Sequence, residues 1–158
     1  LIAGRNEDAR DEFARSVDLT SNAWAYHGLA CLYLKSDPEK AKQFIMEGMA
    51  LQRERLSYQK EGFKILEKCG AYKEIDEEYK KQTAENQKNG RIQYYYVAAL
   101  AKLERNEEAY HLLNDGDGID VSDIREGDSD IQSIWESLHE KVYGEKGHLP
   151  HYYNFKVN

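Results

Sequence analysis

The sequence predicts an all-α fold, and three observations lead to that prediction. Apolar residues recur at intervals of three and four residues, as in helices that face a core. Proline occurs only at Pro38 and Pro150, so no proline interrupts the helices between them. Positions separated by a constant interval carry the same kind of side chain, which indicates helical hairpins that repeat along the chain.

Turn-forming residues divide this helical pattern at regular intervals and set the expected boundaries. They gather at residues 35–38, 69–70, 88–90, 104–106 and 115–118. We therefore expect half of a hairpin at residues 1–20, followed by hairpins at 21–52, 53–88 and 91–114. An acidic loop is expected at 115–129, a capping helix at 130–144 and a tail at 145–158.

The constant interval is clearest at Ala41, Ile75 and Ala109, which are evenly spaced and are expected to occupy the same place in successive hairpins. We call this spacing the repeat period. Other positions follow in the same register: Gly28 with Gly62, Leu29 with Phe63 and Val97, Leu32 with Leu66 and Leu100, and Ile45 with Tyr79 and Leu113. Because a single hairpin cannot bury both of its apolar faces, neighbouring hairpins are expected to stack and share a core.

These residues resemble the tetratricopeptide repeat family. Residues 23–28 look like the family's opening Trp and its close-approach Gly, and residues 69–75 and 104–109 look like its loop into the second helix. Residues 4–9, with Phe13, repeat that second-helix signature, so we expect the chain to be a piece of a longer protein. The resemblance spans residues 1–114 and implies a right-handed solenoid of helical hairpins that binds protein. Bulky Tyr96 departs from it, since Gly28 and Gly62 hold that position earlier.

The stretch at 130–144 suits a helix that caps the last hairpin. Its apolar residues share one face at helical spacing. They are Ile131, Ile134, Trp135, Leu138 and Val142. Ser129 or Asp130 is expected to cap its start and Gly144 to end it.

In the tetratricopeptide family the first helix of each hairpin lines the inner surface, so the resemblance implies a protein-binding face there. The candidate binding residues are Asn22, Tyr33, Gln59, Glu67, Gln93 and Tyr94, accompanied by Ala25, Leu29, Leu32, Phe63 and Val97. The basic and asparagine positions with which the family clamps a C-terminal carboxylate are not matched. A face of Tyr, Gln and apolar side chains suits a helix or an extended apolar segment. Ordinary packing is the alternative for any one of these residues.

Composition narrows the partners that we expect. A net charge of −7 without a basic stripe disfavours nucleic acid, and no apolar run approaches the roughly 20 residues that cross a bilayer. The partner is therefore expected to be a protein or a neighbouring domain of the same polypeptide, and the isolated chain is expected to form a homodimer. Cys31 and Cys69 lie in apolar surroundings and are expected to be small buried residues of a reducing or indifferent compartment, with the cytoplasm favoured.

Neither a cofactor, a metal nor a catalytic group is expected. A calcium loop at residues 114–120 fails because Leu113 and Ile124 would occupy positions that need carboxylates, so a flexible acidic turn is expected instead. No two histidines share a helix at zinc-site spacing, although His148 and His151 flank Pro150. No phosphate loop or nucleophile motif is present, so we expect that the chain is not an enzyme.

A second resemblance covers the last quarter of the chain. Residues 123–128, 134–141 and 149–155 look like the C-terminal end of large bacterial proteins, in which a tetratricopeptide tail follows an uncharacterised β-rich domain related to sugar mutarotases. This resemblance implies an alternative function, namely an accessory domain that packs against a carbohydrate-active enzyme. The frequent tyrosines of the chain would then contact sugar rings. The simpler explanation is that they pack between helices.

Overall fold

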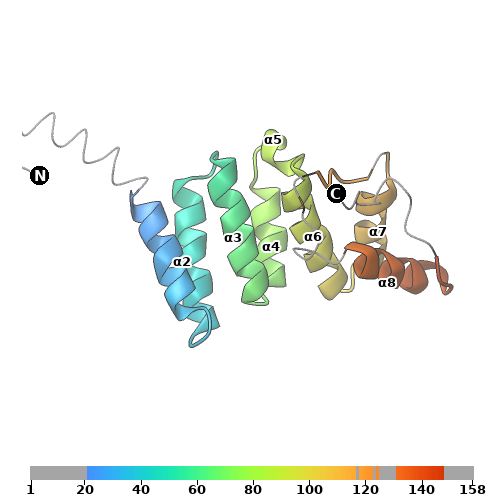
Figure 1. Cartoon of the computed structure of the whole chain (residues 1–158), viewed down its shortest axis with the longest axis horizontal. Coiled ribbons are helices and arrows are strands. Elements are labelled where there is room, and N and C mark those ends of the chain that lie inside the picture. The colour runs from blue at the N-terminus through green and yellow to red at the C-terminus, as the bar shows by residue number, and fades with distance from the viewer. Residues whose placement is uncertain (1–20, 117, 123, 125–130, 148–158) are drawn as a thin grey trace, which may run out of the picture. The chain divides into compact units, whose positions relative to one another are not determined.

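The structure is a computed structural model, and it describes residues 21–116, 118–122, 124 and 131–147 (Figure 1). The described residues form helices joined by turns and loops, and no strand occurs among them, which confirms the all-α prediction. The chain divides after Cys69 into two compact units, which we describe in turn. The division falls inside the predicted hairpin 53–88. The predicted half-hairpin 1–20, the caps Ser129 and Asp130, and the tail from residue 148 lie outside the described residues.

In the first unit three helices lie side by side: residues 21–33, α2 (Pro38–Leu51) and α3 (Leu56–Lys68) (Figure 1). The start of α2 follows from its sequence. Asp37 accepts a hydrogen bond from the backbone N–H of Lys40 at 3.1 Å, and Pro38 occupies the first turn, where its missing N–H is harmless.

The core of the first unit lies between these helices. Its fully buried side chains are Ala23, Ala30, Ala41, Ile45, Met49, Tyr58, Phe63 and Leu66. Two glycines allow the close approach, because a Cβ at Gly48 would overlap the Tyr58 hydroxyl and one at Gly62 would overlap the Met49 side chain. The Tyr58 hydroxyl donates a hydrogen bond to the backbone carbonyl of Ala23, which ties α3 to the helix at 21–33.

The second unit consists of α4 (Tyr72–Lys80), α5 (Ala84–Gln87), α6 (Gly90–Lys102), α7 (Asn106–Asn114) and α8 (Ile131–Tyr143). Helix α6 is central, since it contacts the other four and most of its side chains are buried. Asn89 caps its start by accepting hydrogen bonds from the backbone N–H groups of Arg91 and Ile92. The short α5 begins at a Thr83 cap.

The helix boundaries repeat with the predicted period. Helices α2, α4 and α7 begin at positions 38, 72 and 106, which are evenly spaced, and α3 and α6 begin at positions 56 and 90, with the same spacing. Ala41, Ile75 and Ala109 are each the fourth residue of their helix and fully buried, and each donates its backbone N–H to the carbonyl of the residue preceding the helix. The three positions are therefore locally equivalent.

Tyr96 occupies the repeat position that is glycine at residues 28 and 62, and its ring packs against another aromatic ring. Its ring stacks on Tyr79 of α4 with centroids 3.8 Å apart and planes at 10°. Burial, followed by the nearby charge of Asp76, raises the pKa of Tyr96 to about 12. At this position of α6 an aromatic stack thus replaces a close approach between helices.

Helix α8 matches its predicted position. Ile131, Trp135 and Leu138 are buried, and Ile134 and Val142 are half-buried. Gly144 ends the helix with φ 74°, and its N–H bonds the Glu140 carbonyl at 2.7 Å.

The segment between α7 and α8, which the sequence predicts to be an acidic loop, is described only in part. Its described part buries Ile119 and Ile124. The Asp120 carbonyl lies so close to the start of α6 that a Cβ at Gly90 would overlap it. The described part of a mostly acidic and glycine-rich segment thus contains two buried apolar side chains.

Candidate functional site

The predicted binding residues of the first unit differ in their availability. Asn22 is exposed, and Tyr33 and Glu67 are half-buried, but Gln59 is fully buried. The Gln59 amide donates hydrogen bonds to the carbonyls of Met49 at 3.0 Å and Gln52 at 2.8 Å. Gln59 thereby satisfies the C-terminal carbonyls of α2 and is not available to a partner in this structure.

Tyr33 and Glu67 have different surroundings. The Tyr33 ring stacks on Phe44 with centroids 5.8 Å apart, and the Lys40 ammonium lies 4.5 Å from its centre. Glu67 keeps one carboxylate oxygen, Oε2, buried without a hydrogen-bond partner among the described residues. Burial raises the pKa of Glu67, and the charge of Lys68 opposes this in part.

In the second unit Gln93 is half-buried and Tyr94 is buried, with its ring edge-to-face with Tyr95 at 5.6 Å. Tyr94 is therefore an internal packing residue of α6. Neither the exposure nor the contacts of these two residues indicate a partner.

A continuous exposed surface does occur on the helix at residues 21–33. Asn22, Ala25, Leu29 and Leu32 follow one another at intervals of three and four residues, so they share one helical face, and all four are exposed. We call these four residues the exposed stripe. Leu32 is 71% exposed and Leu29 37%. Residues 21–34 contain no Asp, Glu, Lys or Arg, so this surface is uncharged and largely apolar.

The positions of the two leucines are buried one and two repeat periods later. Leu56 and Gln93, which are counterparts of Asn22 and Ala25, are half-buried. Phe63 and Leu66, the counterparts of the two leucines, are fully buried, and so are Val97 and Leu100 in the next period. Within the first unit α3 packs against α2: Gln59, the counterpart of Ala25, donates to carbonyls at the end of α2, and Met49 lies against Gly62. Among the described residues, a Cβ at Gly28 would meet nothing within 4 Å, in contrast to the close approach at Gly62.

Beside the stripe lies a polar cluster that the sequence reasoning missed. Cys31 is exposed, so the prediction that it is buried is wrong, whereas Cys69 is half-buried. The buried positions of this helix are Ala23 and Ala30, and Cys31 lies one residue beyond that row. Its Sγ is 3.9 Å from Nδ1 of His27, whose Nε2 is 3.5 Å from Oε2 of Glu61 on α3. The four-residue spacing of His27 and Cys31 was the signal that could have revealed the pair.

Aromatic rings surround His27. Trp24 meets it edge-to-face at 5.4 Å and also meets Tyr58 at 4.9 Å. Burial, with a smaller contribution from Cys31, raises the pKa of Tyr58 to about 12. The imidazole is thus oriented by aromatic neighbours and one carboxylate.

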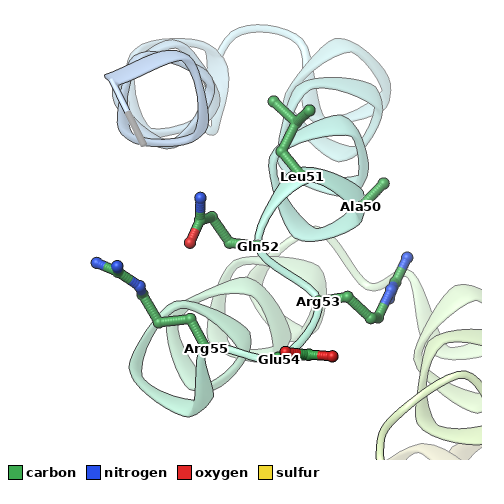
Figure 2. A pocket seen from close by; sticks show the side chains of 6 residues that line it. All are labelled: Ala50, Leu51, Gln52, Arg53, Glu54 and Arg55. Atoms are coloured by element: carbon green, nitrogen blue, oxygen red, sulfur yellow. The ribbon is translucent and has the colours of Figure 1, made fainter. Parts of the chain in front are cut away.

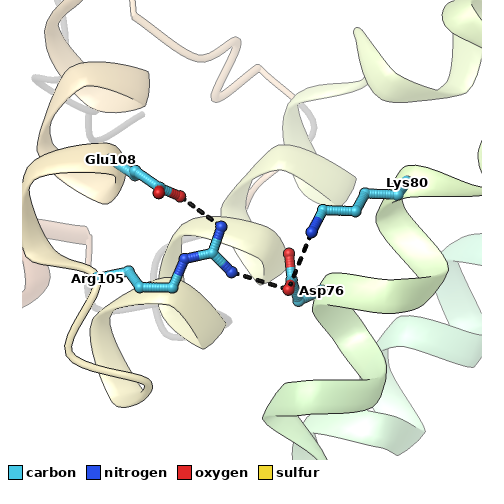
Figure 3. Close-up of polar contacts among 4 residues, drawn as sticks. All are labelled: Asp76, Lys80, Arg105 and Glu108. Carbon is cyan, nitrogen blue, oxygen red and sulfur yellow. Dashed lines mark hydrogen bonds and ion pairs between the residues drawn. The ribbon is translucent and has the colours of Figure 1, made fainter.

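The second unit contains an ionic network that links α4 to α7 (Figure 3). Arg105 donates to Asp76 at 2.8 Å and to Glu108 at 2.5 Å, and Lys80 reaches Asp76 at 3.3 Å. Burial alone would raise the pKa of Asp76, but its hydrogen bonds from Arg105 and Lys80 outweigh burial and hold the pKa below its ordinary value. Asp76 Oδ2 accepts from both cations, and each carboxylate of the network has a cationic neighbour, which is the arrangement of ion pairs that join helices.

Aromatic side chains also join α7 to α8. The Tyr110 hydroxyl lies 3.1 Å from Nδ1 of His139, whose ring stacks on Trp135 with centroids 5.0 Å apart. The Trp135 indole donates to the Asn114 side chain at 2.9 Å. These polar tips have partners within the unit, so packing between helices accounts for this cluster.

A hollow of about 540 Å³ lies at the turn between α2 and α3 (Figure 2). Its lining is the single run 50–55. In Figure 2 Gln52 and Arg55 point to one side, and Ala50 and Arg53 point to the other. Because the side chains diverge, this hollow brings no set of polar groups together on a ligand.

Neither a metal site nor a membrane span occurs in the part of the chain that the structure describes. No three His, Cys, Asp or Glu side chains in it could together hold a metal ion. No helix in it is both long and apolar enough to cross a bilayer. His148 and His151 lie outside that part.

Comparisons with known proteins add no assignment. No family model matches the chain, and searches of curated proteins and of solved structures give no significant match.

Proposed function

We propose that this chain is a non-catalytic scaffold module, a right-handed stack of tetratricopeptide-type hairpins, and that its exposed stripe binds an amphipathic helix of a protein partner. The observation that supports this proposal most directly is the contrast at one repeat position. Leu32 is 71% exposed while its counterparts Leu66 and Leu100 are fully buried. An uncharged helical surface with exposed leucines is unusual where a helix faces solvent and is typical of a surface that binds protein.

The kind of partner follows from what covers the counterpart face. On α3 the counterpart of Ala25, Gln59, contacts the end of α2, an amphipathic helix that buries Ala41, Ile45 and Met49. A helix with the same apolar spacing therefore fits the stripe, in the helix-in-groove manner of many peptide complexes. The absence of charge on the stripe favours an apolar contact face over an acidic or basic one.

The test uses a labelled synthetic peptide with the α2 sequence, Pro38–Leu51, and the full chain, followed by fluorescence anisotropy. We expect saturable binding that weakens at least about tenfold when Leu29 and Leu32 are both changed to Ser, because two apolar contacts are lost. The matched control is the Leu51→Ser, Leu103→Ser pair, since both leucines are 37% exposed and lie outside the stripe. This control should bind as the parent does.

Three outcomes would overturn the proposal. The peptide fails to bind, both double variants weaken binding equally, or sedimentation shows that the stripe variant abolishes self-association without affecting the peptide. The last outcome would identify a second copy of the chain as the occupant. A saturable response of Trp24 fluorescence to oligosaccharides, with no peptide binding, would instead support the accessory role in carbohydrate chemistry, because Trp24 is 40% exposed.

A further inference from the structure

We infer that Cys31 is a reactive thiol, served by His27 as proton acceptor and Glu61 as positioning residue, that exchanges with small-molecule disulfides. This inference rests on side chains beside the exposed stripe and is independent of the proposed scaffold role. A thiol next to an imidazole that a carboxylate orients is the arrangement of an activated sulfur nucleophile.

The geometry gives each of the three side chains a separate part. Cys31 is exposed, so a small reagent can reach its sulfur. His27 lies one turn earlier on the same helix and turns Nδ1 toward that sulfur, at 3.9 Å. Its other nitrogen, Nε2, is shielded from solvent, makes no hydrogen bond among the described residues and lies 3.5 Å from Oε2 of Glu61. A carboxylate at Nε2 favours the tautomer with the proton there, which leaves the Nδ1 lone pair for the thiol.

The exchange then balances without a further reagent. His27 accepts the thiol proton at Nδ1, and the Cys31 thiolate attacks one sulfur of the small disulfide. The original S–S bond breaks as the new bond to Cys31 forms. The departing thiolate takes the proton from His27. One disulfide is consumed and one mixed disulfide is produced, so there is no net oxidation.

The chain contains its own reference thiol. Cys69 is half-buried, and burial raises its pKa, an effect that the charge of Lys42 opposes and that of Glu39 reinforces. No described contact places a histidine against Cys69. If any thiol reacted equally well, the two cysteines would react at similar rates. The inference requires that Cys31 reacts faster than Cys69.

The experiment treats the intact chain with an aromatic disulfide reagent and follows each cysteine separately by peptide mass spectrometry. We expect Cys31 to react at least about tenfold faster than Cys69 in the native chain, because it is accessible and has a base. The difference should vanish in concentrated urea. Equal native rates, or a faster Cys69, would overturn the inference.

Variants separate the imidazole's effect from simple exposure. His27→Gln should slow Cys31 about fivefold or more and leave Cys69 unchanged, and Glu61→Gln should slow Cys31 by less. The control is His111→Gln, since His111 is an exposed histidine of α7 with its own carboxylate neighbour, Asp115, at 3.3 Å. Should His27→Gln lose its helical circular dichroism, Glu61→Gln alone decides. An unchanged Cys31 rate in a folded variant would show that His27 takes no part.

Discussion

The helix at residues 21–33 and helix α3 belong to the same unit and carry related sequences, yet one exposes the face that the other buries. Trp24, Leu29 and Leu32 are exposed, while their counterparts one repeat period later, Tyr58, Phe63 and Leu66, are fully buried. The apolar pattern defines which side of a helix seeks a neighbour. Whether that side is covered depends on neighbouring segments. Helix α3 packs against α2, whereas Leu29 and Leu32 are exposed.

Because of this contrast, a position and its counterpart one repeat period later can serve as controls for each other. Two substitutions of the same type, one repeat period apart, should have different energetic consequences although the residue types are alike. Three experiments test that idea, each with a smaller expected effect than the one before.

The largest difference is expected for Leu66→Ala against Leu32→Ala. Leu66 is fully buried, so its truncation should leave a cavity and cost about 2–5 kcal/mol of unfolding free energy. Leu32 is 71% exposed, so its truncation should change stability by less than about 0.5 kcal/mol. Urea unfolding followed by circular dichroism measures both. Similar losses for the two variants would mean that the face at residues 21–33 is covered in solution.

Opposite signs are expected for Gly62→Ala and Gly28→Ala. A Cβ at Gly62 would overlap Met49, and the overpacking should cost about 1–3 kcal/mol, partly offset by the better helix propensity of alanine. A Cβ at Gly28 meets nothing among the described residues, so alanine there should stabilise by about 0.5–1 kcal/mol. Thermal unfolding of the two variants gives the comparison, and a destabilised Gly28→Ala would contradict it.

The smallest effect is expected for Tyr58→Phe, which removes the hydrogen bond to the Ala23 carbonyl and should cost about 0.5–1.5 kcal/mol at neutral pH. The pKa of Tyr58 is about 12 in the folded chain against an ordinary value of 10. The folded state therefore binds this proton more tightly, and stability falls as pH rises from 10 toward 12. Unfolding measured across that range should fall less steeply for Tyr58→Phe than for the parent. Identical slopes would exclude Tyr58 as a source of the alkaline loss.

Much of the helical framework follows from sequence because its signals are local. Pro38 and the Asp37 cap set the start of α2, Gly144 ends α8, and the repeat period predicts the locally equivalent positions of Ala41, Ile75 and Ala109. The three- and four-residue spacing of apolar residues, which predicts the helices, can be read from the sequence alone.

What could not be predicted depends on contacts between distant segments. The burial of Gln59 reflects two carbonyls at the end of α2, and the exposure of Cys31 reflects the absence of a helix over its face among the described residues. The place of Asp120 against Gly90 joins residues far apart in the sequence, one of them in a segment that looked unstructured. The Glu61 contact with His27 likewise requires knowing how α3 packs.

The turns that precede α4 and α7 differ in sequence, and one of the differences affects stability. Gly70 and Glu104 are equivalent positions of the repeat and share a left-handed backbone, with φ of 68° and 60°. Glycine adopts that conformation freely, whereas glutamate there costs on the order of 1 kcal/mol. In the turn before α7, Glu104 therefore has a backbone conformation that is unfavourable for a residue with a side chain. Replacing the exposed Glu104 with glycine should raise the stability of the chain without altering its buried contacts.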